Sequence, residues 1–308
     1  MKIRTFLIIA ALLAFLAITY FTMTTGTRNR PPAVANKLRV VTSFYPLYYF
    51  ATQIAGDKAI VYNITPAGAE PHDYEPTTQD MAHIEDSKLL ILNGGKLEAW
   101  GDKVKNTLQN TATIIVSVGD DIANQKVIED GETVRDPHVW LDPVLAKKEA
   151  TTIADSLAAV DPANANFYEN NATQLLAKLD ALDQKYRQDL SSCKQKNIAT
   201  AHTAFGYLAR EYEFEQIAIS GLSPDAEPSA KKLADVTDYV KKHNIKYIFF
   251  ESLVSPKLAE TLAYETGAKT LVLNPLEGLT NQEIAQGQDY FTVMRNNLKN
   301  LQTALDCK

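Results

Sequence analysis

From Pro162 to Ser192 the chain contains no glycine and is rich in residues with high helix propensity, chiefly Ala, Leu, Lys and Gln. Asp161-Pro162 at its start is typical of the first turn of a helix. At 1.5 Å per residue, a helix over this stretch would be ~45 Å long. The stretch therefore predicts one long rigid helix, which divides the chain into two parts.

Both parts alternate between short β-branched or leucine-rich runs and segments with helical spacing. Before the long helix, the expected strands are 38–43, 60–65, 88–93 and 111–118, and the expected helices are 46–56, 81–87, 96–110 and 143–159. After it, the expected strands are 197–200, 215–220, 245–251 and 269–274, with helices beginning near residues 203, 229, 255 and 282. Such alternation predicts mostly parallel sheets covered by helices on both faces. The expected fold is α/β, with a leader and linker at 1–37, an N-terminal lobe at 38–160, a connecting helix at 161–193 and a C-terminal lobe at 194–308.

The N-terminus has the pattern of an export signal or a membrane anchor. Lys2 and Arg4 precede an apolar run at residues 6–21, which is slightly short for a typical span of ~20 residues but borders further uncharged residues. Residues 33–35 (Ala-Val-Ala) have the small-x-small form that signal peptidase cleaves, and no cysteine lies nearby to be lipidated. We expect residues from about 36 onward to face the outside, in the periplasm or at the cell surface, with N-terminal membrane association.

The charge and the cysteines of the remaining chain fit an exported protein. Without residues 1–35 it holds 27 basic and 37 acidic residues, a net charge of −10, so nucleic acid is not an expected partner. Cys193 and Cys307 are 114 positions apart. In an oxidising compartment a disulfide between them is the natural hypothesis, and two free buried thiols are the alternative.

Three of the five histidines lie in short segments with the composition of metal-binding loops: His72 in GAEPHDYEP, His138 in RDPHVWLDP and His202 in TAHTAFGYLA. His72 and His202 follow expected strands, as does Glu277 in LNPLEGL, and His138 follows a polar loop after another strand. The carboxyl ends of strands in open α/β sheets are where ligands bind. We therefore predict one metal site in the cleft between the lobes, with two ligands from each.

The remaining candidates have simpler interpretations. His83 lies within a helical stretch, and His243 lies at a helix C-terminus, so both are predicted to be surface residues. Carboxylates beside the expected ligands could bind metal, but orienting a histidine or capping a helix is the favoured role. These carboxylates are Glu70, Asp73 and Glu75 near His72, and Asp136 and Asp142 near His138.

Three imidazoles and one carboxylate favour Zn2+, because a tetrahedral set of three nitrogens and one oxygen suits zinc, whereas manganese and magnesium prefer more oxygen. Four protein ligands saturate the ion, while a hydrolytic zinc enzyme keeps one position for water. We therefore expect a carrier and not an enzyme. A metallohydrolase with Glu277 as the base is the alternative, although the chain contains no HExxH motif.

From about residue 38 to the C-terminus the chain resembles the ZnuA-like or TroA-like metal-binding proteins of ABC importers. The resemblance is carried, in order, by GAEPHDYEP, LNGGKLEAW, DPHVWLDP, TAHTAFGYLA, GLSPDAEPS, FFESLVSPKLAE and LNPLEGL. It implies two α/β lobes bridged by a rigid helix, metal bound between them, and delivery to a membrane permease driven by a cytoplasmic ATPase. A monomer is expected, and some members of the family are described as adhesins.

Within this resemblance His72, His138 and His202 correspond to the three histidine ligands. Many relatives have an aspartate at the position of Asn274, whose neutral amide is a poor ligand, so the resemblance assigns Glu277, with a water as the competing occupant. Manganese-specific relatives tend to have a glutamate in place of His202, which supports zinc; manganese or iron(II) is the alternative cargo. The His-rich loop common in zinc members is absent, because residues 118–136 contain no histidine and are acidic.

Overall fold

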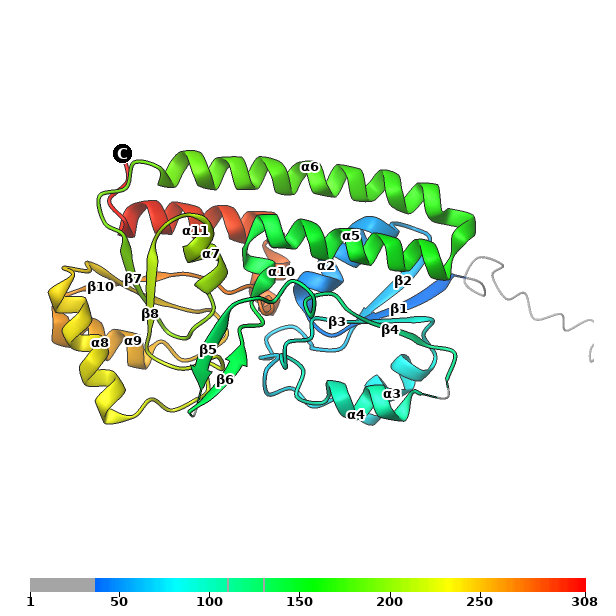
Figure 1. Ribbon diagram of the computed structural model, residues 1–308, viewed down its shortest axis with the longest axis horizontal. Helices are drawn as coiled ribbons and strands as arrows, with labels where there is room; N and C mark the ends of the chain where they lie inside the picture. Colours follow the sequence, from blue (N-terminus) through cyan, green and yellow to red (C-terminus); the bar gives the residue numbers. More distant parts are fainter. Residues whose placement is uncertain (1–36, 110, 130) are drawn as a thin grey trace, which may run out of the picture. The chain divides into compact units, whose positions relative to one another are not determined.

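The computed structural model describes residues 37–109, 111–129 and 131–308, and it has two four-stranded parallel sheets with helices on their faces (Figure 1). This arrangement confirms the predicted α/β class. The apolar run at 6–21 and the Ala-Val-Ala segment at 33–35 lie outside the described residues. Within those residues, no helix has both the length and the apolar character needed to cross a membrane.

The N-terminal sheet has the strand order β2-β1-β3-β4 and is parallel throughout. Side chains alternate along a strand, so Val40, Leu89 and Ile91 pack toward α2 and α5 (Pro143–Val160), whereas Leu90 and Leu92 pack toward α3 and α4. Both faces are thus covered (Figure 1). The elements are β1 (Leu38–Thr42), α2 (Tyr45–Ala55), β2 (Ala59–Asn63), α3 (Thr78–Glu85), β3 (Leu89–Leu92), α4 (Gly101–Thr107) and β4 (Ile114–Ser117).

The C-terminal sheet is also parallel and has the order β10-β9-β7-β8. One face packs against α8 and α9 through Ala199 and Ile248, and the other packs against α7 and α11 through Ile198 and Phe249. The elements are β7 (Asn197–Thr200), α7 (Gly206–Glu211), β8 (Glu215–Ala218), α8 (Ala230–Lys242), β9 (Tyr247–Phe250), α9 (Lys257–Thr266), β10 (Lys269–Val272), α10 (Asn281–Ala285) and α11 (Tyr290–Ala304).

The long helix is present but starts later than predicted. Pro162–Asn164 forms a 3-10 turn, and α6 (Ala165–Leu190) follows it with 26 residues, or about 39 Å. It packs along α5 (Pro143–Val160), and the hydroxyl of Tyr186 donates to the Met294 carbonyl of α11 at 2.7 Å. Just beyond the ends of α6 and α11, Cys193 and Cys307 form a disulfide, which confirms the predicted pairing.

Trp140 joins the cores of the two lobes. It lies in a 3-10 turn (Val139–Leu141) that precedes α5, is fully buried, and contacts the ring of Phe44 edge to face with centroids 4.7 Å apart. Its indole N–H donates to the Pro275 carbonyl at 2.7 Å, and its own carbonyl accepts the Tyr290 hydroxyl at 2.6 Å. One continuous core therefore runs from the N-terminal sheet to α11.

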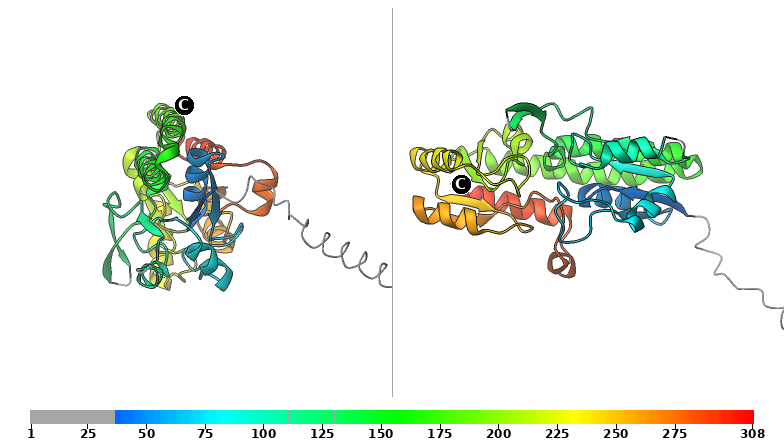
Figure 2. Two further views of the ribbon diagram at one scale, coloured as in Figure 1. Left: turned by 90° about the vertical axis from the view of Figure 1, so that its right-hand side faces the viewer. Right: turned by 90° about the horizontal axis from the view of Figure 1, so that it is seen from below.

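The interpretation of the segment before His138 as a polar loop was wrong. It contains an antiparallel hairpin of β5 (Lys126–Glu129) and β6 (Glu132–Arg135). Asp130-Gly131 between two short alternating runs is a recognised hairpin signal, but each run has only four residues and carries too few apolar side chains to stand out. The hairpin and α10 lie on opposite sides of the described part of the chain (Figure 2).

Glu149 is an unusual buried residue on α5. Its side chain is fully inaccessible, and neither carboxylate oxygen has a hydrogen-bond partner among the described residues. Burial, with a further contribution from buried Glu98, raises the pKa of Glu149 well above its ordinary value. The folded protein therefore binds this proton more tightly than the unfolded chain does, so the group costs stability once the pH exceeds ~4.3, the ordinary pKa of glutamate.

We expect Glu149→Met to raise the free energy of unfolding by about 1–3 kcal/mol at pH 8, because methionine has a similar shape and leaves no polar group unpaired. The gain should shrink toward pH 4, where the carboxyl is protonated in the folded state and mostly protonated in the unfolded chain. Urea unfolding at the two pH values measures it, with exposed Glu169→Met as the control. Equal or lower stability of Glu149→Met at pH 8 would contradict this expectation.

Candidate metal centre

His72 lies in the loop that follows β2 in the N-terminal lobe. Its backbone N–H donates to the Glu70 carboxylate at 2.9 Å, and its side chain is 9% exposed. Glu70 thus holds the backbone of the local turn, a role not among those expected for the carboxylates beside this histidine. Burial lowers the pKa of His72, which favours the neutral imidazole that binds metal.

His138 is fully buried and is oriented by Asp136. The carboxylate Oδ1 of Asp136 accepts the backbone N–H of His138 at 3.0 Å and lies 2.8 Å from its Nδ1. This pairing directs Nε2 toward the other candidate ligands, as expected for a histidine whose second ring nitrogen is held by a carboxylate. The neighbouring Asp142 caps α5 by accepting the Val144 N–H at 2.8 Å.

His202 follows β7 in the C-terminal lobe and has an equivalent partner. Its Nδ1 lies 2.7 Å from Oε1 of Glu251, the first residue after β9, and both side chains are buried. Glu251 was not among the residues expected at the site. Its position at the end of the strand in FFESL was the available signal, because parallel strands β7 and β9 are neighbours and end at the same edge.

Glu277 reaches the cluster from the loop after β10. Leu276 has a left-handed backbone, with φ of 59°, and its N–H donates to the Asn274 side-chain oxygen at 2.7 Å. The amide nitrogen of Asn274 donates to Ser252 and Glu283, at 2.8 and 3.2 Å. Asn274 therefore shapes the turn that presents Glu277 and does not itself point into the cluster.

The four side chains converge on one point. Nε2 of His138 lies 3.3 Å from Nε2 of His72, 3.3 Å from Nε2 of His202 and 3.2 Å from Oε1 of Glu277. That Glu277 oxygen is also 3.4 Å from Nε2 of His72 and 3.2 Å from Nε2 of His202. All four atoms lie within 4.8 Å of one another. His83 and His243 are not part of this cluster; their rings stack on Tyr62 and Tyr239.

The cluster has the protonation chemistry of an ion-binding site. Burial alone would raise the pKa of Glu277, but His202, His138 and His72 together hold that pKa well below its usual range. Burial alone would lower the pKa of His138, but Asp136 and Glu277 outweigh it and raise that pKa. Burial, with help from Glu277, raises the pKa of Glu70 to about 9, so Glu277 is the charged carboxylate. A bound cation would take the place of the protons shared here.

The fold and this cluster together define a two-lobed solute-binding protein with a buried site for one small cation. The sequence profile of "ZnuA: Zinc-uptake complex component A periplasmic" matches residues 40–304, so the chain belongs to this family. The family consists of extracytoplasmic components of zinc-uptake systems and not of enzymes, which agrees with the expectation of a carrier.

Individual relatives extend this result. The high-affinity zinc uptake system protein ZnuA of Bacillus subtilis is 41% identical over 291 residues, which cover 91% of each chain. The zinc-bound ZnuA-like domain of Streptococcus pneumoniae AdcA is 45% identical, with a TM-score of 0.77 over 88% of this chain and 100% of that domain. The chain spans 56% of the length of the whole AdcA lipoprotein. A laminin-binding protein, Lmb of Streptococcus agalactiae, described as an adhesin with metal-transporting activity, is 35% identical with a TM-score of 0.80 over 88% of this chain and 100% of its own.

Proposed function

We propose that the chain captures Zn2+ with Nε2 of His72, His138 and His202 and with Oε1 of Glu277. The observation that carries this assignment is the set of five distances of 3.2–3.4 Å between these atoms. A regular tetrahedron with edges of that length has its centre about 2.0 Å from each corner, which is the length of zinc bonds to histidine and carboxylate. Five of the six edges have this length, and the sixth, between Nε2 of His72 and Nε2 of His202, is at most 4.8 Å.

The same geometry supports carriage over catalysis. Four protein atoms saturate a tetrahedral ion, so no position is left for an activated water. Glu277 Oε1 is in contact with all three imidazoles, which suits a ligand better than a base awaiting a substrate. Zinc is the cargo we propose, as in the named zinc proteins among the relatives. Manganese or iron(II) is the alternative, because affinity in this series follows the Irving–Williams order and does not by itself fix cellular use.

We also propose the surroundings in which capture takes place. The protein would act as a monomer outside the cytoplasmic membrane, held there by the N-terminal apolar segment, and would deliver the ion to the membrane permease of an ABC importer with its cytoplasmic ATPase. The family's role in zinc uptake supports these partners. Residues 38–160 and 194–308 would be the two lobes, with 161–193 as their connection.

A crystal soaked with zinc and measured at the zinc absorption edge tests the site directly. We expect one strong anomalous peak, bonded to the three Nε2 atoms and to Glu277 at about 2.0–2.2 Å. A water in place of Glu277 would correct the ligand set, and a peak elsewhere would refute the site. Metal analysis of protein purified from its own host should find zinc; manganese or iron in its place would identify the alternative cargo.

A further inference from the structure

Residues 124–129 and 131–136, which we call the inter-lobe strap, belong to the N-terminal lobe by sequence but are bonded to the C-terminal lobe. The strap contains the hairpin β5–β6 and ends two residues before His138. At its start Gln125 Nε2 donates to the Gly206 carbonyl at 3.1 Å, and Arg210 donates to the Asn124 side chain at 3.1 Å. The segment is therefore attached to α7, which follows His202.

The base of the strap is held by one hydroxyl. Tyr207 is fully buried, accepts the Gln125 N–H at 3.0 Å and donates to the Asp136 carbonyl at 3.0 Å. Asp136 in turn orients His138. The approach is close, because a Cβ on Gly206 would lie only 2.9 Å from Asp136 Oδ2. Tyr207 thus connects the lobe that carries His202 to the residue that directs His138.

The tip of the strap is held by Glu129. Its two carboxylate oxygens lie 3.1 and 3.0 Å from the Leu222 N–H, which donates to them. The Gly221 carbonyl accepts the N–H of Thr203, the residue after His202, at 2.8 Å. The approach is close here too, because a Cβ on Gly221 would lie 2.1 Å from Glu129 Oε1 and would displace that carboxylate. The tip is therefore bonded to the 221–222 loop, and that loop is bonded in turn to the backbone beside His202.

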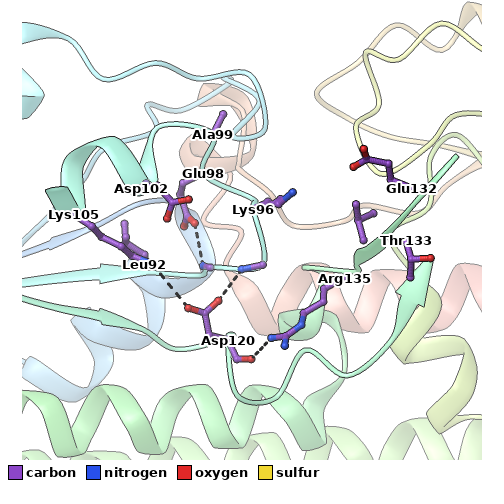
Figure 3. A pocket seen from close by; sticks show the side chains of 14 residues that line it. Leu92, Lys96, Glu98, Ala99, Asp102, Lys105, Asp120, Glu132, Thr133 and Arg135 are labelled. Atoms are coloured by element: carbon purple, nitrogen blue, oxygen red, sulfur yellow. Dashed lines mark hydrogen bonds and ion pairs between the residues drawn. The ribbon is translucent and has the colours of Figure 1, made fainter. Parts of the chain in front are cut away.

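On its other side the strap faces a cavity that lies between it and the N-terminal lobe. This cavity of about 720 Å³ separates β6 from the 94–100 loop and the start of α4, and it is lined by charged residues, among them Lys96, Lys105 and Glu132 (Figure 3). Arg135 reaches past it to donate to the Asp120 carbonyl at 3.0 Å. Apart from this bond, β6 has open space on one side, and the strap is hydrogen-bonded to the C-terminal lobe on the other. The bonds of Tyr207 and Glu129 lie at its base and at its tip.

We propose that Tyr207 and Glu129 are positioning residues, which fasten the strap so that His138 is held at the spacing from His202 that a shared ion requires. This inference rests on the zinc-binding function proposed above and adds to it a means of controlling release. While the hydrogen bonds of Tyr207 and Glu129 are intact, Asp136 and His138 are held in position by the C-terminal lobe. Breaking these hydrogen bonds allows His138 to move locally, without separation of the lobes.

Zinc dissociation from the full chain, followed with a chromophoric chelator in excess, tests this proposal. We expect Tyr207→Phe, which removes two buried hydrogen bonds, and Glu129→Ala, which removes the charged acceptor of the Leu222 N–H, each to release zinc about five- to tenfold faster. Glu129→Gln should release zinc at nearly the wild-type rate, because the amide oxygen can still accept from Leu222. Metal-free melting temperatures are recorded in parallel.

Tyr186→Phe is the control. Tyr186 lies near the C-terminal end of α6, is buried like Tyr207, and its hydroxyl also donates to a backbone carbonyl, that of Met294. It should lower the metal-free melting temperature, by less than Tyr207→Phe because it removes one hydrogen bond and not two, but leave zinc release unchanged. Wild-type release from both Tyr207→Phe and Glu129→Ala, in a protein that still loses zinc on His138→Ala, would overturn the strap proposal alone. A wild-type protein that binds no zinc would overturn the proposed function and the strap proposal together.

Discussion

Replacing His138 by alanine should abolish tight zinc binding. The Nε2 atom of His138 lies within 3.3 Å of all three other candidate ligand atoms, so its loss removes a ligand that contacts every other member of the cluster. It also leaves the buried Asp136 carboxylate without its imidazole partner. Loss of a residue that only orients a metal ligand costs ~10–100-fold in affinity, and loss of the ligand itself should cost more. Calorimetric titration of the metal-free protein measures the change.

Two further variants make that titration specific. Asp136→Asn should weaken zinc binding by only ~10–100-fold, because it disturbs the orientation of His138 but leaves the ligand in place. His243→Ala should bind zinc as the wild type does, since this ring stacks on Tyr239 outside the cluster. An unchanged zinc affinity in His138→Ala would refute the ligand assignment.

Loss of the disulfide between Cys193 and Cys307 should lower the free energy of unfolding by about 4–5 kcal/mol on the chain-entropy account, because the bridge closes a loop of 114 positions. The double variant Cys193→Ser, Cys307→Ser reports this loss in urea unfolding. Zinc affinity should be retained, since the bridge lies beyond the ends of α6 and α11 and not in the metal cluster.

Reductant provides the internal control for that experiment. It should bring wild-type stability down to that of the double serine variant and leave the variant itself unchanged. Titration of thiols in unfolded, unreduced wild-type protein should find none. Two reactive thiols would show that the bridge does not form in solution.

The sequence indicated the residues of the cluster better than the residues that support them. All eight expected strands of the two parallel sheets are present, because buried parallel strands appear as short apolar runs whatever their neighbours. His72, His202 and Glu277 could be placed because each follows such a run. Glu251 could not be paired with His202, since the two are 49 positions apart and meet only through the adjacency of β7 and β9.

Other features depend on long-range packing that local patterns do not record. Glu149 has the same appearance in the sequence as any helical glutamate, and only the packing of α5 buries it without a partner. The left-handed backbone of Leu276 follows from the hydrogen bonds around Asn274 and not from a glycine, the usual residue for such a turn. The attachment of the hairpin to Tyr207 and Leu222 likewise exists only after both lobes have folded.

The position of Trp140 between the lobes means that neither half is a transplantable module. Its ring packs with Phe44 from one half, while Pro275 and Tyr290 from the other half take up its polar groups. Cutting the chain in two would expose aromatic surface on both pieces. It would also leave hydrogen-bonding groups without partners in each piece. Chimeras of two relatives that join the N-terminal half of one to the C-terminal half of the other should therefore be insoluble, unless Trp140 and its contacts in both halves come from the same relative.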